Sequence, residues 1–188
     1  MNTHERIVAA AAELTTESGW AAITMSKLAD RVGVSRQTVY NEVGSKPRLA
    51  EEMILHELAA FLGEVERAFD AHPCDLVAAI RAACRGVLEF AQDNRLLKAV
   101  VSATHGADTE LLPLLTTHAE PLLGTAKEVV RARVAAYDVA LPAARLDAAI
   151  DLIVRVVLSH VMQPSASPEA TADDIAWLSA QALAPQGQ

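Results

Sequence analysis

The segment Arg36–Asn41 carries a dense group of side chains that can hydrogen-bond to nucleic acid. Its polar members are Arg36, Gln37, Thr38, Tyr40 and Asn41. Guanidinium, amide and hydroxyl groups of this kind contact base edges in a DNA major groove, and they also contact phosphate oxygens. A helix over Arg36–Val43 would present them together, which indicates a DNA-reading surface.

Such a surface needs a second helix to position it, and the preceding residues predict one. Ala29 is small enough for two helices to cross closely, Gly33 accepts a left-handed turn, and Val39 anchors the following helix. Ser35 is a suitable N-cap for that helix. The apolar residues that complete the small core are Leu28, Val32 and Val34. We therefore predict a helix-turn-helix, and the alternative is an ordinary helical hairpin with a polar outer face.

This segment resembles the DNA-binding region of TetR-family transcriptional regulators. The matching positions are Thr24, Met25, Leu28, Ala29, Gly33, Val34, Ser35, Tyr40 and Lys46. Two positions depart from the pattern, because Glu42 and Val43 stand where the family usually has a His or Tyr and a Phe. A carboxylate near the phosphate backbone is repulsive, so Glu42 disfavours a backbone contact at position 42.

We expect DNA contacts from the start of each helix-turn-helix helix, from the second helix itself and from the start of the next helix. The full set is Thr24, Ser26, Lys27, Ser35, Arg36, Gln37, Thr38, Tyr40, Asn41 and Lys46. Gly44 ends the second helix, and Ser45-Lys46-Pro47 opens another. Lys46 then lies at a helix N-terminus, where it favours phosphate binding, the role that the resemblance gives to the matching lysine.

The composition predicts an all-α protein, since 52% of the 188 residues are hydrophobic and only 4% are aromatic. The sequence has no run of alternating β-branched residues that would predict a strand. We expect a three-helix helix-turn-helix DNA-binding domain over 1–48, then a helical ligand-binding and dimerisation domain over 49–188 that begins with a connecting helix over 49–70. Further helices are expected over 75–92, 94–104, 109–118, 120–138, 142–162 and 168–183. Pro113 and Pro121 argue against one long helix over Glu110–Val139.

Charge is divided unevenly along the chain, whose formal net charge is −8. Residues 1–50 contain six Lys or Arg and five Asp or Glu, whereas residues 51–188 contain ten and nineteen. The acidic body should repel DNA and direct it to the N-terminal end. The sequence has no stretch long and apolar enough for a membrane span or a signal peptide, so we expect a cytoplasmic protein with no membrane partner.

The apolar, aromatic-poor body favours a small hydrophobic effector, of lipid-like or fatty-acyl character. Candidate pocket residues, each of which has plain core as its alternative, are Phe61, Phe90, Leu97, Val101, His105, Leu114, His118, Tyr137 and His160. A metal held by the three histidines of this set, or a redox signal sensed by Cys74 and Cys84, is the alternative effector. Neither group has a metal-ligand spacing, so we expect no metal and no cofactor.

The last two helices are expected to form a dimer interface, because the helix over 142–162 has an apolar surface wider than one contact requires. Its candidate residues are Leu146, Ile150, Ile153, Val154, Val157, Leu158 and Val161, followed by Ile175, Trp177 and Leu178 of the last helix. The alternative is that these helices only close their own domain. The resemblance implies a four-helix dimer interface.

No catalytic motif appears, so we do not expect an enzyme. A helical scaffold that binds another protein would explain the wide apolar helix but not the DNA-reading segment. The sequence therefore favours a homodimeric repressor that is released from a near-palindromic DNA operator by a small hydrophobic effector.

Overall fold

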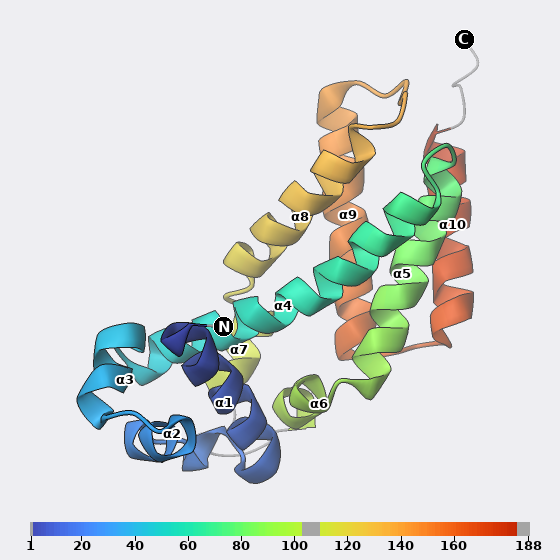
Figure 1. The fold of residues 1–188 in the computed structure, drawn as a ribbon. Coiled ribbons are helices and arrows are strands. Elements are labelled where there is room, and N and C mark those ends of the chain that lie inside the picture. The colour runs from blue at the N-terminus through green and yellow to red at the C-terminus, as the bar shows by residue number, and fades with distance from the viewer. Residues whose placement is uncertain (1, 103–109, 184–188) are drawn as a thin grey trace. The chain divides into compact units, whose positions relative to one another are not determined.

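The computed structural model describes residues 2–102 and 110–183, and these are helical with no strand among them. The elements in chain order are α1 (Thr3–Ser18), the 3-10 turn η1 (Trp20–Ala22), α2 (Met25–Val32), α3 (Arg36–Val43), α4 (Lys46–Ala71), α5 (Leu76–Asp93), α6 (Arg95–Ser102), α7 (Leu112–Leu115), α8 (Glu120–Val134), α9 (Ala143–Met162) and α10 (Pro168–Leu183) (Figure 1). The predicted all-α class is confirmed.

The chain divides into two compact units. The first comprises Met1–Ala59 with Asn94–Leu122, and the second comprises Ala60–Asp93 with Leu123–Gln188. Helix α6 packs against α1, so the unit that contains the helix-turn-helix also includes later segments of the chain. The functional boundary predicted after residue 48 stays a prediction.

The first unit is built around the apolar faces of short, well-capped helices. Asn2 caps α1 in a capping box with Glu5, and Gly19 ends the helix with a φ of 78°. The side chains that are almost fully buried here include Ile7, Trp20, Leu28, Val39, Val43, Leu49 and Met53. Because α1, α2, α3 and the first turns of α4 all contribute to this set, they form one core that holds the helix-turn-helix.

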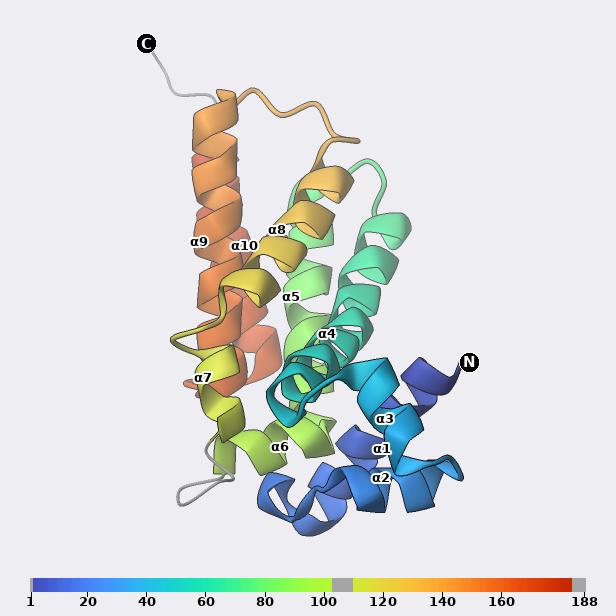
Figure 2. The same ribbon diagram turned by 90° about the vertical axis from the view of Figure 1, so that its left-hand side faces the viewer.

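The second unit packs α5 against α10, which lie side by side in both ribbon views (Figures 1 and 2). Small side chains on both helices allow this close approach, since Ala79 and Ala172 are each 0% exposed. A second core cluster joins α4, α5 and α8, and its buried members are Val65, Ala68, Phe69, Ala79, Ala83, Val87 and Val134.

Two predicted helices are clearly longer than those of the structure, and the end of a third lies outside the described residues. The helix expected over 109–118 is only α7, Leu112–Leu115, and Pro113 lies in its first turn. Helix α8 ends at Val134 and not at 138, because Ala136 and Tyr137 donate to carbonyls three residues back and so leave the α-helical pattern. The helix expected over 94–104 is described only as α6, and residues 103–109 lie outside the described part. None of the described helices combines the length and apolar character that a bilayer span needs.

Candidate DNA-binding site

Local capping defines both helices of the predicted helix-turn-helix. The Thr24 hydroxyl accepts from the backbone N–H of Lys27 at 3.2 Å, and the Ser35 hydroxyl accepts from that of Thr38 at 3.0 Å. Between the helices, Gly33 has a φ of +76°, in the left-handed region that a glycine adopts without strain. Helix α3 begins at Arg36 and ends at Val43 as predicted.

Helix α3 has one buried and one exposed face. Val39 and Val43 are 0% exposed and fix the helix to its core. The predicted contact residues Arg36, Gln37, Tyr40 and Asn41 all lie on the exposed side. Helix α3 therefore presents four donor-bearing side chains to solvent.

The exposed side chains of α3 are linked in pairs one turn apart. Arg36 donates from Nη2 to the Tyr40 hydroxyl at 3.2 Å, and its guanidinium lies 5.4 Å from the centre of the Tyr40 ring. Gln37 donates from Nε2 to Asn41 Oδ1 at 2.9 Å. Such i,i+4 pairs restrict rotamers, so less side-chain entropy is lost when these groups contact DNA.

Three other predicted contact residues have partners within the protein. The Thr38 hydroxyl lies 2.8 Å from that of Ser35, and the Lys27 ammonium donates to the Ala22 carbonyl oxygen at 2.8 Å. Ser26 is exposed at the start of α2. The Lys27 ammonium keeps two further N–H donors, and one of the two paired hydroxyls keeps its O–H. Contacts to phosphate from Thr24, Ser26, Lys27, Ser35 and Thr38 stay predictions.

Lys46 is tied to Trp20. Its Nζ donates to the Trp20 carbonyl oxygen at 3.0 Å and lies 4.8 Å from the centre of the indole ring. Trp20 is 2% exposed, and its indole N–H donates to Glu110 Oε2 at 3.0 Å. The sequence places Lys46 correctly at the first turn of α4, but it gives no sign of this partner.

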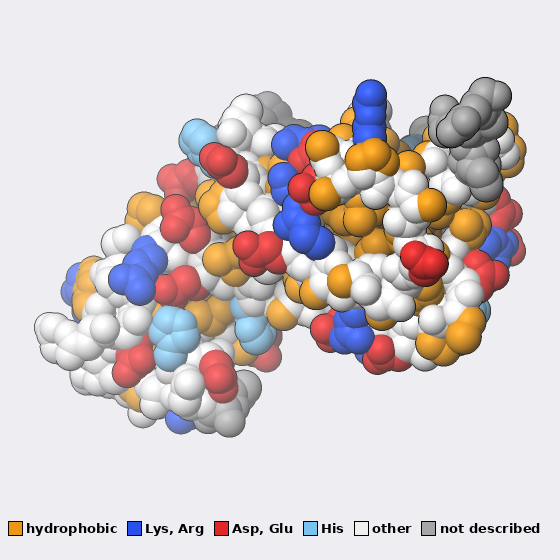
Figure 3. Space-filling view, turned by 90° about the horizontal axis from the view of Figure 1, so that it is seen from above, with side chains coloured by type: hydrophobic (Ala, Val, Ile, Leu, Met, Phe, Trp, Pro, Cys, Tyr) orange, Lys and Arg blue, Asp and Glu red, His pale blue; other side chains and the backbone are white. Residues whose placement is uncertain are grey.

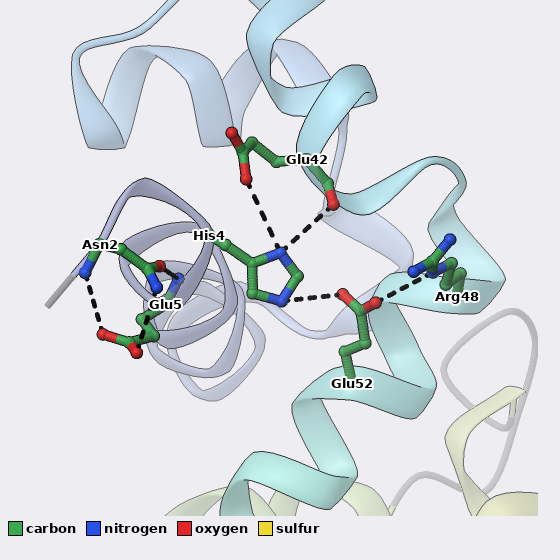
Figure 4. Close-up of polar contacts among 6 residues, drawn as sticks. All are labelled: Asn2, His4, Glu5, Glu42, Arg48 and Glu52. Atoms are coloured by element: carbon green, nitrogen blue, oxygen red, sulfur yellow. Dashed lines mark hydrogen bonds and ion pairs between the residues drawn. The ribbon is translucent and has the colours of Figure 1, made fainter.

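Glu42, one of the two departures from the expected pattern, is linked to α1 and α4 through His4 (Figure 4). His4 Nδ1 lies 3.2 Å from the Glu42 carbonyl oxygen and 3.9 Å from its carboxylate. His4 Nε2 lies 3.5 Å from Glu52 Oε2, and Arg48 donates to Glu52 Oε1 at 3.0 Å. Sequence reasoning missed His4 because its partners are 38 or more residues away.

Two family models account for most of the chain. The model for bacterial regulatory proteins of the tetR family matches residues 7–53, and the model for the bacterial tetracyclin repressor C-terminal domain matches residues 75–181. The chain belongs to the TetR family. It is a DNA-binding transcriptional regulator, and no catalytic family is indicated.

Related proteins agree with this assignment. The HTH-type transcriptional regulator AlkX of Mycobacterium tuberculosis is 30% identical over 177 residues, which are 93% of this chain and 82% of AlkX. The crystal structure of the TetR-family repressor AlkX from Dietzia sp., implicated in biodegradation of n-alkanes, has a TM-score of 0.78 at 29% identity and covers 96% of this chain and 94% of its own. FadR from Bacillus subtilis, solved with stearoyl-CoA, shares the fold with a TM-score of 0.57 at 14% identity, covering 97% and 99% of the chains.

The effector candidates of this TetR-family regulator fall into both compact units. In the second unit, Phe61 and Phe90 meet edge to face at 4.8 Å, and Tyr137 packs on Phe69 at 5.9 Å. The Tyr137 hydroxyl donates to the His72 carbonyl oxygen at 2.7 Å, and burial raises the pKa of Tyr137. His160 is half-buried, and its Nδ1 lies 3.3 Å from the Ser165 hydroxyl.

The remaining effector candidates belong to the first unit. Leu97 is buried, Val101 and Leu114 are half-buried, and His118 is exposed, whereas His105 lies outside the described residues. A pocket shared by the whole set stays a prediction.

The alternative effectors find little support in the described residues. No group of three or more His, Cys, Asp or Glu gathers there in a way that could hold a metal ion. Cys74 is exposed and Cys84 is buried, and burial raises the pKa of the Cys84 thiol to about 12. A thiol that stays protonated is a poor redox sensor.

The candidate dimer residues divide between a core and a surface. Ile150 and Ile175 are buried inside their own unit, and Leu146, Ile153, Val157 and Val161 are half-buried against its core clusters. Val154 and Leu158 are half-buried as well. Because α5 and α8 cover one side of α9, these positions point inward to varying degrees.

The second unit also exposes large apolar side chains on α9 and on α10, which we together call its outer apolar face. It consists of Leu152 (63% exposed), Val156 (41%), Trp177 (62%) and Leu178 (58%). Trp177 and Leu178 are among the residues expected at the dimer interface, whereas Leu152 and Val156 are not. Figure 3 shows how apolar side chains reach the surface among charged ones on the side of the molecule that it draws.

Proposed function

We propose that this TetR-family regulator is a homodimeric repressor whose two α3 helices read a near-palindromic operator and which leaves DNA when a small hydrophobic effector binds. The observation that carries the proposal is the exposed face of α3, where Arg36 is paired with Tyr40 and Gln37 with Asn41. These are the side-chain types that read adenine, guanine and phosphate.

The case for a dimer rests on the outer apolar face. Its four large side chains are each at least 41% exposed, although contact with water is unfavourable for them. A second copy of the chain would bury this face. Two α3 helices about 34–36 Å apart would then reach successive major grooves, which makes the operator symmetric.

The case for a hydrophobic effector rests on the relatives and on the interior. The AlkX repressor from Dietzia, at 29% identity over nearly the whole chain, is implicated in n-alkane biodegradation. The second unit has an apolar interior in which Phe61, Phe90 and Tyr137 are only half-buried. A long aliphatic molecule, such as an alkane-derived alcohol, acid or acyl thioester, is the effector class that fits both observations.

Fluorescence anisotropy with DNA from upstream of the gene tests the proposal. The full-length chain should bind a DNA site with twofold symmetry as a dimer. Analytical ultracentrifugation measures how many chains bind each site. Addition of a C16 fatty acid or its acyl-CoA should release the DNA, and a C4 acid should not. Binding without any sequence preference would contradict the repressor assignment, and release by both chain lengths would contradict the effector class.

A further inference from the structure

Both ring nitrogens of His4 face hydrogen-bond acceptors. On one side, Nδ1 lies 3.2 Å from the backbone carbonyl oxygen of Glu42, the next-to-last residue of α3. On the other side, Nε2 lies 3.5 Å from Glu52 Oε2 on α4. A carbonyl oxygen and a carboxylate oxygen accept but do not donate, so each position calls for an N–H on the ring.

The Glu52 carboxylate also lacks a hydrogen-bond donor at one of its two oxygens. Oε1 accepts from Arg48 Nε at 3.0 Å, whereas Oε2 is buried and has no hydrogen-bond partner within the described part of the chain. Burial of an unsatisfied carboxylate oxygen is costly. His4 Nε2, at 3.5 Å, is a group that could supply a donor.

A neutral imidazole cannot satisfy both sides, because it carries a single N–H. Donation from Nδ1 to Glu42 would leave a lone pair on Nε2 facing the Glu52 carboxylate. Donation from Nε2 would leave a lone pair facing the Glu42 carbonyl. The imidazolium has two N–H groups and can offer one to each acceptor.

Acidic groups face His4 from α3 and from α4. From α3 it faces the Glu42 carboxylate at 3.9 Å and the negative end of the helix dipole. From α4 it faces Glu52, whose other oxygen binds Arg48. On α1 itself Glu5 is close in sequence, and its carboxylate accepts from the Asn2 backbone N–H at 2.9 Å (Figure 4).

We propose that His4, as an imidazolium, is a positioning residue for DNA binding. It ties the end of the recognition helix α3 to α1 and α4, and it offsets the charge of Glu42, which would otherwise repel phosphate. The proposal rests on α3 being the DNA-reading helix. Because histidine changes its charge between about pH 5 and 8, operator affinity should rise as the pH falls through this range.

The test measures operator affinity of the full chain at constant ionic strength between pH 6 and pH 8. Wild type should bind the operator about threefold more tightly at pH 6 than at pH 8. A ratio of this size corresponds to the free energy that a partly exposed ion pair contributes. His4→Gln should bind weakly at both pH values. His56→Gln, at an exposed position of α4, should keep the wild-type pH dependence.

Glu52→Gln separates this role from a merely structural one. The amide N–H of the new side chain can donate to the lone pair of neutral His4 and keep the link between the helices, so this variant should lose less affinity than wild type between pH 6 and pH 8. Equal wild-type affinity at both pH values, or a His4→Gln variant that keeps the pH dependence, would overturn the proposal.

A readout without DNA distinguishes failure of this proposal from failure of the repressor assignment. The difference in unfolding free energy between wild type and His4→Gln should be larger at pH 6 than at pH 8, because the imidazolium contacts are present at the lower pH and are lost as pH rises. An equal difference at both pH values would exclude the charged link even if no operator is bound.

Discussion

The Lys46 ammonium donates to the Trp20 carbonyl oxygen at 3.0 Å while it lies 4.8 Å from the centre of the Trp20 ring. The hydrogen bond fixes the start of α4 to the turn before α2. An ammonium has three N–H donors, so two of them can still reach a phosphate. We therefore predict that Lys46 holds the helices and contacts DNA at the same time.

Replacement of Lys46 by Met should weaken binding to all DNA sequences, because both the tie to Trp20 and one phosphate contact are lost. The slope of log affinity against log salt concentration should become shallower by about 1. Lys98→Met, at an exposed position of α6, is the matched control and should leave the slope unchanged. An unaltered slope in Lys46→Met would mean that the ammonium serves only Trp20.

Gln37→Ala should relax sequence preference more than it lowers total affinity. The amide of Gln37 is held by Asn41 on the exposed face of α3, where it can read a base edge. Loss of one such contact reduces discrimination by about 1–3 kcal/mol at a single base pair. Anisotropy with a set of operators mutated one pair at a time measures this loss. Gln181→Ala on α10 is the control and should leave discrimination unchanged. An equal loss of affinity for all operators would instead indicate that Gln37 contacts the DNA backbone.

Leu152→Glu should convert the protein to a monomer, because it puts a charge into the outer apolar face, where Leu152 is 63% exposed. Sedimentation velocity measures the mass of the particle. Operator affinity should fall by about tenfold or more, since each half-site is then bound separately. Leu55→Glu, at another exposed leucine (39%), should remain dimeric. A dimeric Leu152→Glu variant would place the interface elsewhere.

The ionised Asp173 carboxylate should stabilise the folded state at neutral pH, and this contribution should be lost at acidic pH. The hydrogen bond from Arg81 lowers the pKa of Asp173 in the folded state below the usual value of 3.8. A depressed pKa means that the contribution is present above the unfolded-state pKa and is lost as pH falls through the folded-state pKa. The wild-type advantage over Asp173→Asn in urea unfolding should therefore be larger at pH 7 than at pH 3.

The neighbouring Asp174→Asn is the matched control for this measurement, because Asp174 is also exposed on α10. Its effect on unfolding should be smaller than that of Asp173→Asn at pH 7. Equal effects of the two variants would show that the ion pair with Arg81 adds nothing measurable, as happens for many surface pairs.

The helix-turn-helix follows from local sequence. The caps at Thr24 and Ser35 act over three residues, and Gly33 sets the turn by its own backbone freedom. Interactions of such short range are written directly into neighbouring residue types, so the bounds of α3 could be predicted to the residue.

Longer contacts and the orientation of α9 were decided only by the tertiary structure. Lys46 meets Trp20 across 26 residues, and His4 meets Glu42 across 38, and neither spacing is a pattern that sequence reveals. Helix α9 is apolar around much of its circumference, so periodicity alone does not separate buried Ile150 from exposed Leu152. Their difference arises because neighbouring helices of the folded unit cover one side of α9 and leave the other open.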